Sequence, residues 1–239
     1  MEKPQIITIL EDAQLAHQAG DFVNALKFYE HFFDHALDDD PLALYGARLS
    51  HCLSGWGELA QVFPGAKNRL DAKRRATLEN YLDKRNPEHF HDYLSICRVL
   101  GCEEDALEAF LKLHHSEPKS AAKLSKYLWD DLINAEQWQV CSVLMEQANQ
   151  KLDELFAVFD EATRLKEFDP SFNSLKFDQH IVDTLLTDVQ KIVLVLRHSN
   201  RLDDIGLLQR QFQQGVTTRD HSLLTKQVHA KSSFLFAGH

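Results

Sequence analysis

The sequence is poor in glycine and proline, the residues on which most turns between β-strands depend. Only 9 Gly and 6 Pro occur among 239 residues, whereas 44% of the residues are hydrophobic and 26% are charged. Such a composition is typical of a globular helical protein, because helices need few turns and bury one apolar stripe. The sequence therefore predicts an all-α fold, and the chain is long enough to build a substantial core.

The chain also has little cysteine and no long apolar run. Its four cysteines, Cys52, Cys97, Cys102 and Cys141, show no CxxC spacing, and the start MEKPQIITILEDAQ lacks the apolar segment of a secretion signal. The longest apolar run near the C-terminus, residues 192–196, is far shorter than the roughly 20 residues of a membrane helix. These absences predict a cytoplasmic protein without a membrane helix.

Positive charge is scarce, since the formal net charge is -10 with histidine neutral. Nucleic-acid phosphates require clustered cations, so this charge argues against general affinity for nucleic acid. Residues 66–85 are an exception, because seven basic and three acidic side chains there leave about +4 locally. The basic segment 67–75 has two interpretations, attraction of an acidic peptide or RNA backbone and a solvated helix face. The lack of interleaved aromatics that would stack bases favours the second.

Catalytic motifs are lacking as well. No Gly-rich loop follows a predicted strand, and no serine has the surroundings of a nucleophile elbow. His31 and His35 of HFFDH lie one helical turn apart, but Phe32 stands where a zinc hydrolase of the HExxH type needs its general-base Glu. We therefore predict no metal, no cofactor and no catalytic residues.

What the sequence does contain is a short pattern of residue sizes that occurs twice. AGDFVNALKFYEHFF reads G-x4-A-x3-aromatic through Gly20, Ala25 and Tyr29, and residues 101–110 repeat the pattern. Glycine takes the positive-φ turn that ends one helix, and alanine lets the next helix approach its neighbour closely. The aromatic side chain fills the space beside that contact. Each match therefore predicts an antiparallel helix hairpin.

Proline residues mark where these hairpins begin and end. Pro118 ends the second helix of the hairpin that turns at Gly101, and Asp40 followed by Pro41 reads as an N-cap and a first helical position. Upstream of Gly101, the segment PEHFHDYLSICRVL carries one apolar stripe at helical spacing. The hairpins are thus bounded on both sides.

This arrangement resembles the tetratricopeptide repeat, a helix-turn-helix unit of about 34 residues. Residues 87–120 match best and residues 5–40 match second, while the segments GWGELA and EQWQVCSVLMEQA belong to two degenerate units. The turn positions Gly20, Gly55, Gly101 and Glu136 are separated by 35, 46 and 35 residues. The middle spacing predicts an insertion around the basic segment.

The resemblance covers roughly residues 5–150 and implies a right-handed α-solenoid of antiparallel helix hairpins. Beyond it the helical period continues through DELFAVFDEATRL and HIVDTLLTDVQKIVLVL, with a loop between them. We expect residues 1–150 to form the repeats and residues 151–239 to be C-terminal helices that close the solenoid as one elongated domain. The apolar end SSFLFAGH predicts docking on this protein or, as a homodimer, on another copy.

The resemblance also implies that the first helix of each hairpin lines a concave groove. In this register the groove residues are Gln14, His17, His91, Ser95, Arg98, Lys126 and Asp130. Three of them, His91, Arg98 and Lys126, would form a weakly basic strip on an acidic protein. Family members that grip a C-terminal carboxylate have Lys and Asn where this chain has Gln14 and His17, so the sequence departs from that pattern.

Two classes of function follow from these features. A concave surface of stacked hairpins implies a non-catalytic scaffold or adaptor that holds an acidic or amphipathic segment of another protein. The alternative is a helical enzyme or sensor that depends on a metal or small molecule, with a site between the repeats and the C-terminal helices. Its candidate ligands are histidines such as His31, His35, His180 and His198. Stoichiometric metal in the purified protein would favour the alternative.

Overall fold

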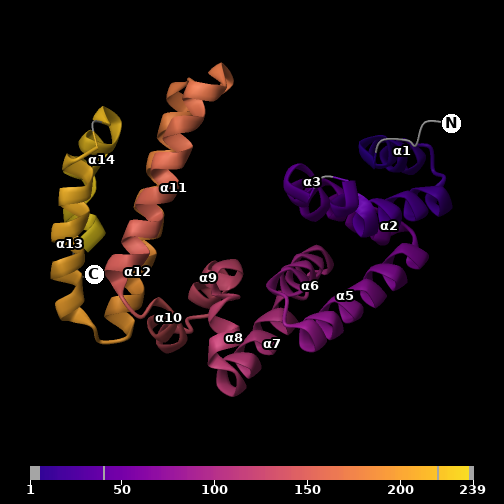
Figure 1. The fold of residues 1–239 in the computed structure, drawn as a ribbon, viewed down its shortest axis with the longest axis horizontal. Helices are drawn as coiled ribbons and strands as arrows, with labels where there is room; N and C mark the ends of the chain where they lie inside the picture. Colours follow the sequence, from indigo (N-terminus) through magenta and orange to yellow (C-terminus); the bar gives the residue numbers. More distant parts are fainter. Residues whose placement is uncertain (1–5, 40, 220, 237–239) are drawn as a thin grey trace. The chain divides into compact units, whose positions relative to one another are not determined.

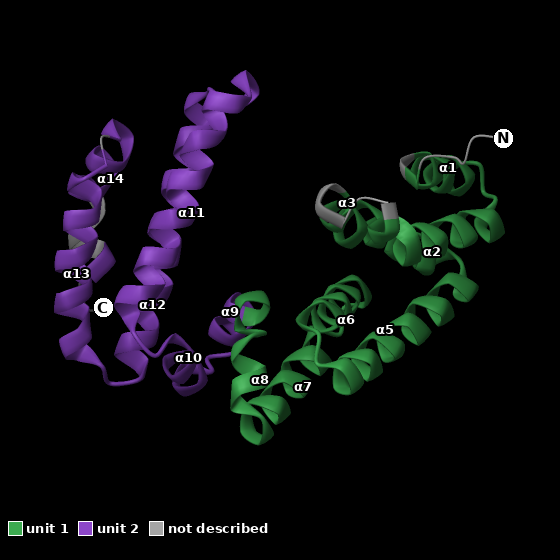
Figure 2. Cartoon of the chain, in the orientation of Figure 1, with its two compact units in different colours: residues 1–128 green, residues 129–239 purple. Residues whose placement is uncertain are grey.

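A computed structural model describes residues 6–39, 41–219 and 221–236. Within these residues every regular element is a helix (Figure 1), so the predicted all-α fold is confirmed. None of the helices in these three ranges is long and apolar enough to cross a membrane. The chain divides into two compact units, Met1–Leu128 and Trp129–His239 (Figure 2), a boundary that falls before residue 150.

Unit 1 contains three helix hairpins and the beginning of a fourth. In chain order its elements are α1 (Ile6–Gln18), α2 (Phe22–Asp39), α3 (Pro41–Ala47), the π-helical turn η1 (Arg48–Cys52), α4 (Leu53–Val62), α5 (Pro64–Lys84), α6 (Pro87–Leu100), α7 (Glu103–Ser116), α8 (Pro118–Ala122) and the start of α9 (Ser125–Asn134). Because α3, η1 and α4 follow one another directly, they act as one long first helix that pairs with α5. The N-cap expected at Asp40 lies outside the described residues.

The turns of the first and third hairpins form as the size pattern predicts. Gly20 and Gly101 have φ of 77° and 67°, the left-handed region that glycine adopts at little cost. After each glycine the chain bonds back to the helix it leaves, as when the Cys102 amide donates to the Cys97 carbonyl at 2.9 Å. Glu136, the predicted turn of the last degenerate unit, also has a positive φ of 54°.

Gly55 has a different role from the predicted one. It lies inside α4, and the second hairpin instead turns at Phe63, whose backbone is extended directly before Pro64. A Cβ on Gly55 would lie 2.5 Å from the Tyr29 hydroxyl of α2, and one on Gly57 would lie 2.3 Å from Val99 Cγ1 of α6. The prediction that Gly55 closes a hairpin is therefore wrong. Both glycines instead let α4 pack closely between α2 and α6.

Replacing Gly57 with alanine is expected to lower the stability of unit 1 by about 1–3 kcal/mol, because the added methyl group overpacks the contact with Val99. The measurement is the urea midpoint followed by helical circular dichroism. Gly46→Ala is the matched control, since no atom lies within 4 Å of a Cβ placed there. Equal midpoints for the two variants would contradict the close approach.

The basic segment 67–75 holds α5 against α2. Arg69 Nε donates to Glu30 at 2.6 Å, and Lys73 Nζ donates to Asp34 at 2.6 Å. Both pairs join residues 39 positions apart, so the second helices of the first two hairpins run parallel in a fixed register. These cations are thus engaged by carboxylates of the chain itself.

Unit 2 is built around one long hairpin. Its elements are the rest of α9, α10 (Trp138–Met145), α11 (Ala148–Phe168), the short 3₁₀ turn η2 (Pro170–Phe172), α12 (Leu175–His198), α13 (Leu202–Thr217) and α14 (Ser222–Phe236). The loop expected between α11 and α12 is present at η2. Both α13 and α14 pack on the α11–α12 hairpin, and α10 packs on α12.

The end of the chain docks on its own unit as far as it is described. Leu235 is buried, and the Arg197 guanidinium of α12 donates to the Phe236 carbonyl at 2.9 Å. The Phe236 ring also lies 5.9 Å from that of Phe212 in α13. The apolar segment predicted to dock therefore contacts this protein, although its last three residues lie outside the described ranges.

Candidate functional site

The structure gathers three of the predicted groove residues around one tyrosine of unit 1. The His91 ring stacks on the Tyr127 ring with centroids 4.1 Å apart and an interplanar angle of 12°. Arg98 Nη2 donates to the Tyr127 carbonyl at 3.2 Å, and Lys126 Nζ lies 4.8 Å from the Tyr127 ring centroid. Residues from α6 and α9 thus form one surface, which we call the Tyr127 platform.

His91 contributes no positive charge to this platform at neutral pH. A hydrogen bond of 2.8 Å joins its Nδ1 and the Tyr45 hydroxyl, and its ring is half-buried. Burial lowers the pKa of His91 to about 4, with further contributions from Arg98, Arg48 and Lys126. The predicted basic strip of three residues is therefore two cations flanking a neutral aromatic pair.

A buried ion pair lies behind His91. Arg48, the first residue of η1, donates to the carboxylate of Asp92 in α6, and both residues are buried. The Arg48 guanidinium also lies 4.5 Å from the Phe33 ring centroid. Burial raises the pKa of Asp92, and the Arg48 charge opposes that rise. The pair fixes α6 against the wide π-helical turn, a geometry often found at functional positions.

The remaining predicted groove residues lie apart from the platform. Gln14 and His17 line a separate polar hollow of about 530 Å³ in unit 1. Ser95 is 8% exposed, because that turn of α6 faces the core, so its side chain offers little surface to a partner. Asp130 belongs to unit 2, where its carboxylate accepts from Lys191 Nζ at 2.7 Å.

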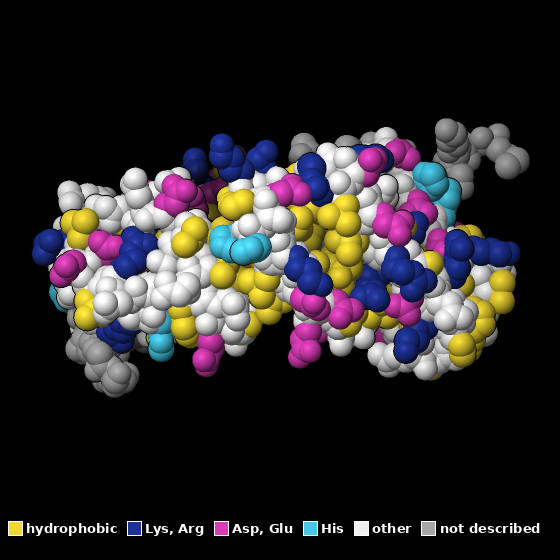
Figure 3. Space-filling view, turned by 90° about the horizontal axis from the view of Figure 1, so that it is seen from below, with side chains coloured by type: hydrophobic (Ala, Val, Ile, Leu, Met, Phe, Trp, Pro, Cys, Tyr) yellow, Lys and Arg dark blue, Asp and Glu magenta, His cyan; other side chains and the backbone are white. Residues whose placement is uncertain are grey.

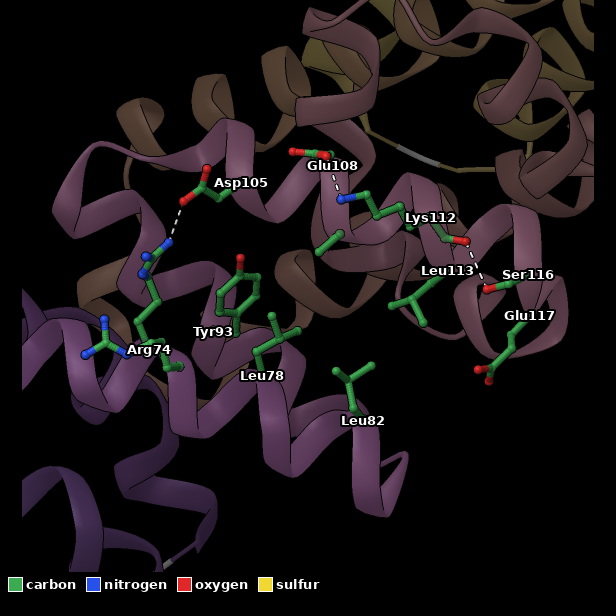
Figure 4. A pocket seen from close by; sticks show the side chains of 12 residues that line it. Arg74, Leu78, Leu82, Tyr93, Asp105, Glu108, Lys112, Leu113, Ser116 and Glu117 are labelled. Atoms are coloured by element: carbon green, nitrogen blue, oxygen red, sulfur yellow. Dashed lines mark hydrogen bonds and ion pairs between the residues drawn. The ribbon is translucent and has the colours of Figure 1, made fainter.

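A hollow that the sequence reasoning missed lies between α5 and α7 (Figure 4). Its volume is about 550 Å³, and the apolar side chains of Leu78, Leu82, Tyr93 and Leu113 point into it. The space-filling view shows hydrophobic side chains exposed among basic and acidic ones on unit 1, in the right half of the picture (Figure 3). The signal in the sequence is the i, i+4 spacing of Leu78 and Leu82 in an otherwise charged helix.

Ion pairs bound this hollow at both ends. Arg74 bonds Asp105 at 2.5 Å, and Arg85 bonds Glu117 at 2.5 Å. The pairs join residues 31 and 32 positions apart, so α5 and α7 run parallel, as α2 and α5 do. Because these rim charges are paired with one another, the hollow offers an apolar surface more than an electrostatic one.

The histidines of the metal alternative lie in separate surroundings. His31 and His35 are exposed on α2 with ring centroids 4.7 Å apart. In unit 2, His198 stacks on Trp138 with centroids 4.4 Å apart, and His180 is exposed on α12. Among the residues that the structure describes, no group of three or more His, Cys, Asp or Glu side chains is placed to hold a metal ion.

The fold and these surfaces define an all-helical protein of antiparallel hairpins with an aromatic platform between two cations. No protein-family model matches the chain, and no curated protein or solved structure is significantly similar to it. Function is therefore inferred from the residues and their geometry alone.

Proposed function

We propose that this chain is a non-catalytic scaffold that binds an acidic or amphipathic segment of another protein. The observation that carries the proposal is the Tyr127 platform, where the exposed cations Arg98 and Lys126 flank the stacked rings of His91 and Tyr127. Carboxylates of a bound segment would accept hydrogen bonds from the two cations, while its apolar side chains pack on the rings. On a protein of net charge -10, the positive charge of these two residues favours acidic partners and speeds their encounter with the platform.

The stacking of hairpins in unit 1 supports a tetratricopeptide-like, right-handed α-solenoid as the frame of this surface. The second helices α2, α5 and α7 run parallel, with ion pairs joining residues 39 and then 31 or 32 positions apart. The first helices of the second and third hairpins are also joined. Tyr45 bonds His91 and Arg48 bonds Asp92, pairs that lie 46 and 44 residues apart in the sequence. Repeated contacts between successive hairpins are the property that lets a solenoid present an extended binding surface.

A reducing compartment, the cytoplasm, is the location we propose. Cys52, Cys97, Cys102 and Cys141 are all unpaired in the structure. Paired cysteines are common in secreted proteins and rare in the cytosol. The test is to denature the protein as isolated from its source, without reductant, and to treat it with a thiol-blocking reagent. Denaturation is needed because Cys52, Cys97 and Cys141 are buried. A mass increase that corresponds to fewer than four blocked thiols would contradict this location.

The Arg98→Glu, Lys126→Glu double variant is expected to bind acidic peptides roughly 10- to 100-fold more weakly, because two charge-assisted contacts become repulsive. The probes are peptides selected by display against the wild-type chain, measured by fluorescence polarisation. Circular dichroism confirms that the variant is folded. A selection that yields no acidic peptide would show that the platform has no specific binding site for acidic segments.

The matched control for this variant is Lys67→Glu, Lys84→Glu. Both lysines are exposed on α5, which contributes no residue to the platform, and the control changes the net charge by the same amount. We expect it to bind nearly as tightly as the wild type. An equal loss in the two double variants would assign the binding to net charge instead of the platform.

A further inference from the structure

The long hairpin of unit 2 has one packed side and one open side. Phe156 of α11 stacks on Phe212 of α13 with centroids 5.7 Å apart, and α14 packs on α12. On a different face, the two helices enclose a hollow of about 250 Å³ whose lining includes Leu155, Val158 and Leu165 of α11. Leu155 and Val158 lie three residues apart, and Leu165 lies seven residues beyond Val158, so they form one apolar stripe along the helix.

The short helices α9 and α10 cover only one end of the open side. Asp130 of α9 bonds Lys191 of α12 at 2.7 Å, and Lys151 Nζ of α11 lies 5.5 Å from the Trp129 ring. With 10 and 8 residues against 21 and 24, α9 and α10 span about 12–15 Å beside helices of about 32–36 Å. Within the described part of unit 2, the rest of this face, toward η2, is left exposed.

Large apolar side chains are exposed on this uncovered part. Val158 is 63% exposed, Leu165 is 41% exposed, and Phe168 and Leu175 at the end of the hairpin are 80% and 75% exposed. Val158 and Leu165 line the same hollow, and exposed apolar side chains that gather in this way mark an interaction surface more often than an ordinary solvated face. Burying the stripe against another helix would remove this apolar area from water.

The charges at the two edges of the open face have opposite signs. Glu161 is exposed on α11 beside the lining residue Ala162, and the exposed His180 lines the hollow from α12, one turn from the exposed Lys176. Helical spacing puts Glu161 on the side of the α11 stripe away from α12, and Lys176 and His180 on the side of the α12 stripe away from α11. Glu161 and His180 lie within about one helical turn of the same height along the hairpin, because the Lys166–Asp178 pair sets the register of α11 against α12. A twofold axis parallel to the helices would place α11 of one copy over α12 of another, with each acidic edge on a basic edge.

We propose that a second copy of this chain docks on the open face of α11 and α12, in an antiparallel, twofold-symmetric four-helix contact. The stripe of one hairpin fills the hollow of the other, and Glu161 of each copy faces His180 of its partner. The uncovered stretch is about 21 Å long and two helices or about 20 Å wide. A footprint of about 400 Å² per copy, or about 800 Å² in total, is smaller than that of stable specific interfaces, so the dimer is weak and reversible. This contact involves unit 2 alone and is independent of the proposed peptide binding.

Sedimentation of the full-length chain over about 5–500 µM, a range suited to weak dimers, tests the contact. We expect the wild type to shift from monomer to dimer with concentration, and Leu165→Lys to raise the dissociation constant at least roughly tenfold, because it buries an unpaired charge. Leu207→Lys on α13 is the matched control, since Leu207 is 40% exposed and Leu165 is 41% exposed. A wild type that stays monomeric, or equal effects of the two substitutions, would overturn the proposal.

A charge exchange tests the geometry itself. Glu161→Arg is expected to weaken the dimer because it places a cation near Lys176 of the other copy, and His180→Glu because it sets two carboxylates against each other. The chain that carries both substitutions, or an equimolar mixture of the two single variants, should recover most of the lost affinity. Failure of recovery would exclude this arrangement. A monomeric chain that binds an added amphipathic peptide through Leu165 would assign the face to a different partner.

Discussion

Replacing Asp92 with alanine is expected to lower the free energy of unfolding by about 3–5 kcal/mol, because it leaves the buried Arg48 guanidinium without its counter-charge. The charge has no easy route to solvent, since Arg48 is 4% exposed and its guanidinium lies against the Phe33 ring. Replacing both partners with apolar residues, as in Arg48→Met, Asp92→Leu, should restore most of the stability, because no charge then remains to be desolvated.

The measurement follows unit 1 through Trp56, which is fully buried there. A background in which Trp129 and Trp138 are phenylalanine leaves Trp56 as the one indole, so its fluorescence in urea reports this unit separately from unit 2. A double-mutant cycle over Arg48 and Asp92 isolates their coupling. If Asp92→Ala costs the same in the presence and absence of Arg48, the two side chains do not form the pair described.

Acidification from pH 6.5 to about 4 is expected to cost unit 1 roughly 2–3 kcal/mol through His91 alone. Burial, aided by Arg98, Arg48 and Lys126, lowers the pKa of His91 to about 4, whereas the unfolded chain keeps the ordinary value of 6.5. Between these values the unfolded state binds a proton that the folded state does not. The contribution of His91 is therefore complete above pH 6.5, is lost as the pH falls through this window, and changes no further below about pH 4.

The pH dependence is isolated by comparing the wild type with His91→Gln. The difference between their unfolding free energies should change across pH 6.5 to 4 and be flat above pH 7. His115→Gln is the control, since His115 is exposed on α7 of the same unit, and it should retain the wild-type slope. Parallel curves for the wild type and His91→Gln would show that this ring is protonated as readily in the folded state as in the unfolded one.

Features set by local backbone geometry could be predicted from the sequence. Gly20 and Gly101 were predicted as turns because a positive φ is a property of the residue itself, and both adopt it. Gly55 was wrongly predicted to be a turn. Glycine is required there because Tyr29 of another helix leaves no room for a side chain. A sequence does not distinguish a glycine that turns the chain from one that admits a neighbour.

The candidate site divides in the same way. The resemblance to the tetratricopeptide repeat implied that His91, Arg98 and Lys126 share a surface, and the structure places them around Tyr127. The pairing of Arg48 with Asp92 joins residues 44 positions apart, and it depends on how one hairpin rests on the next. The sequence signal for this pair was Arg48 itself. It lies four residues after Leu44 and four before Cys52, a charged residue in an otherwise apolar helical stripe.

The close packing of α4 between α2 and α6 makes distant relatives of this chain recognisable from a few residues. Arg48, Gly55, Gly57 and Asp92 follow one another at intervals of seven, two and thirty-five residues. Each is fixed by a buried contact with another helix, while the exposed residues between them can change freely. A protein that shares this four-residue spacing within a helical pattern is expected to share the packing of the second and third hairpins, even where its surface and its partners have diverged.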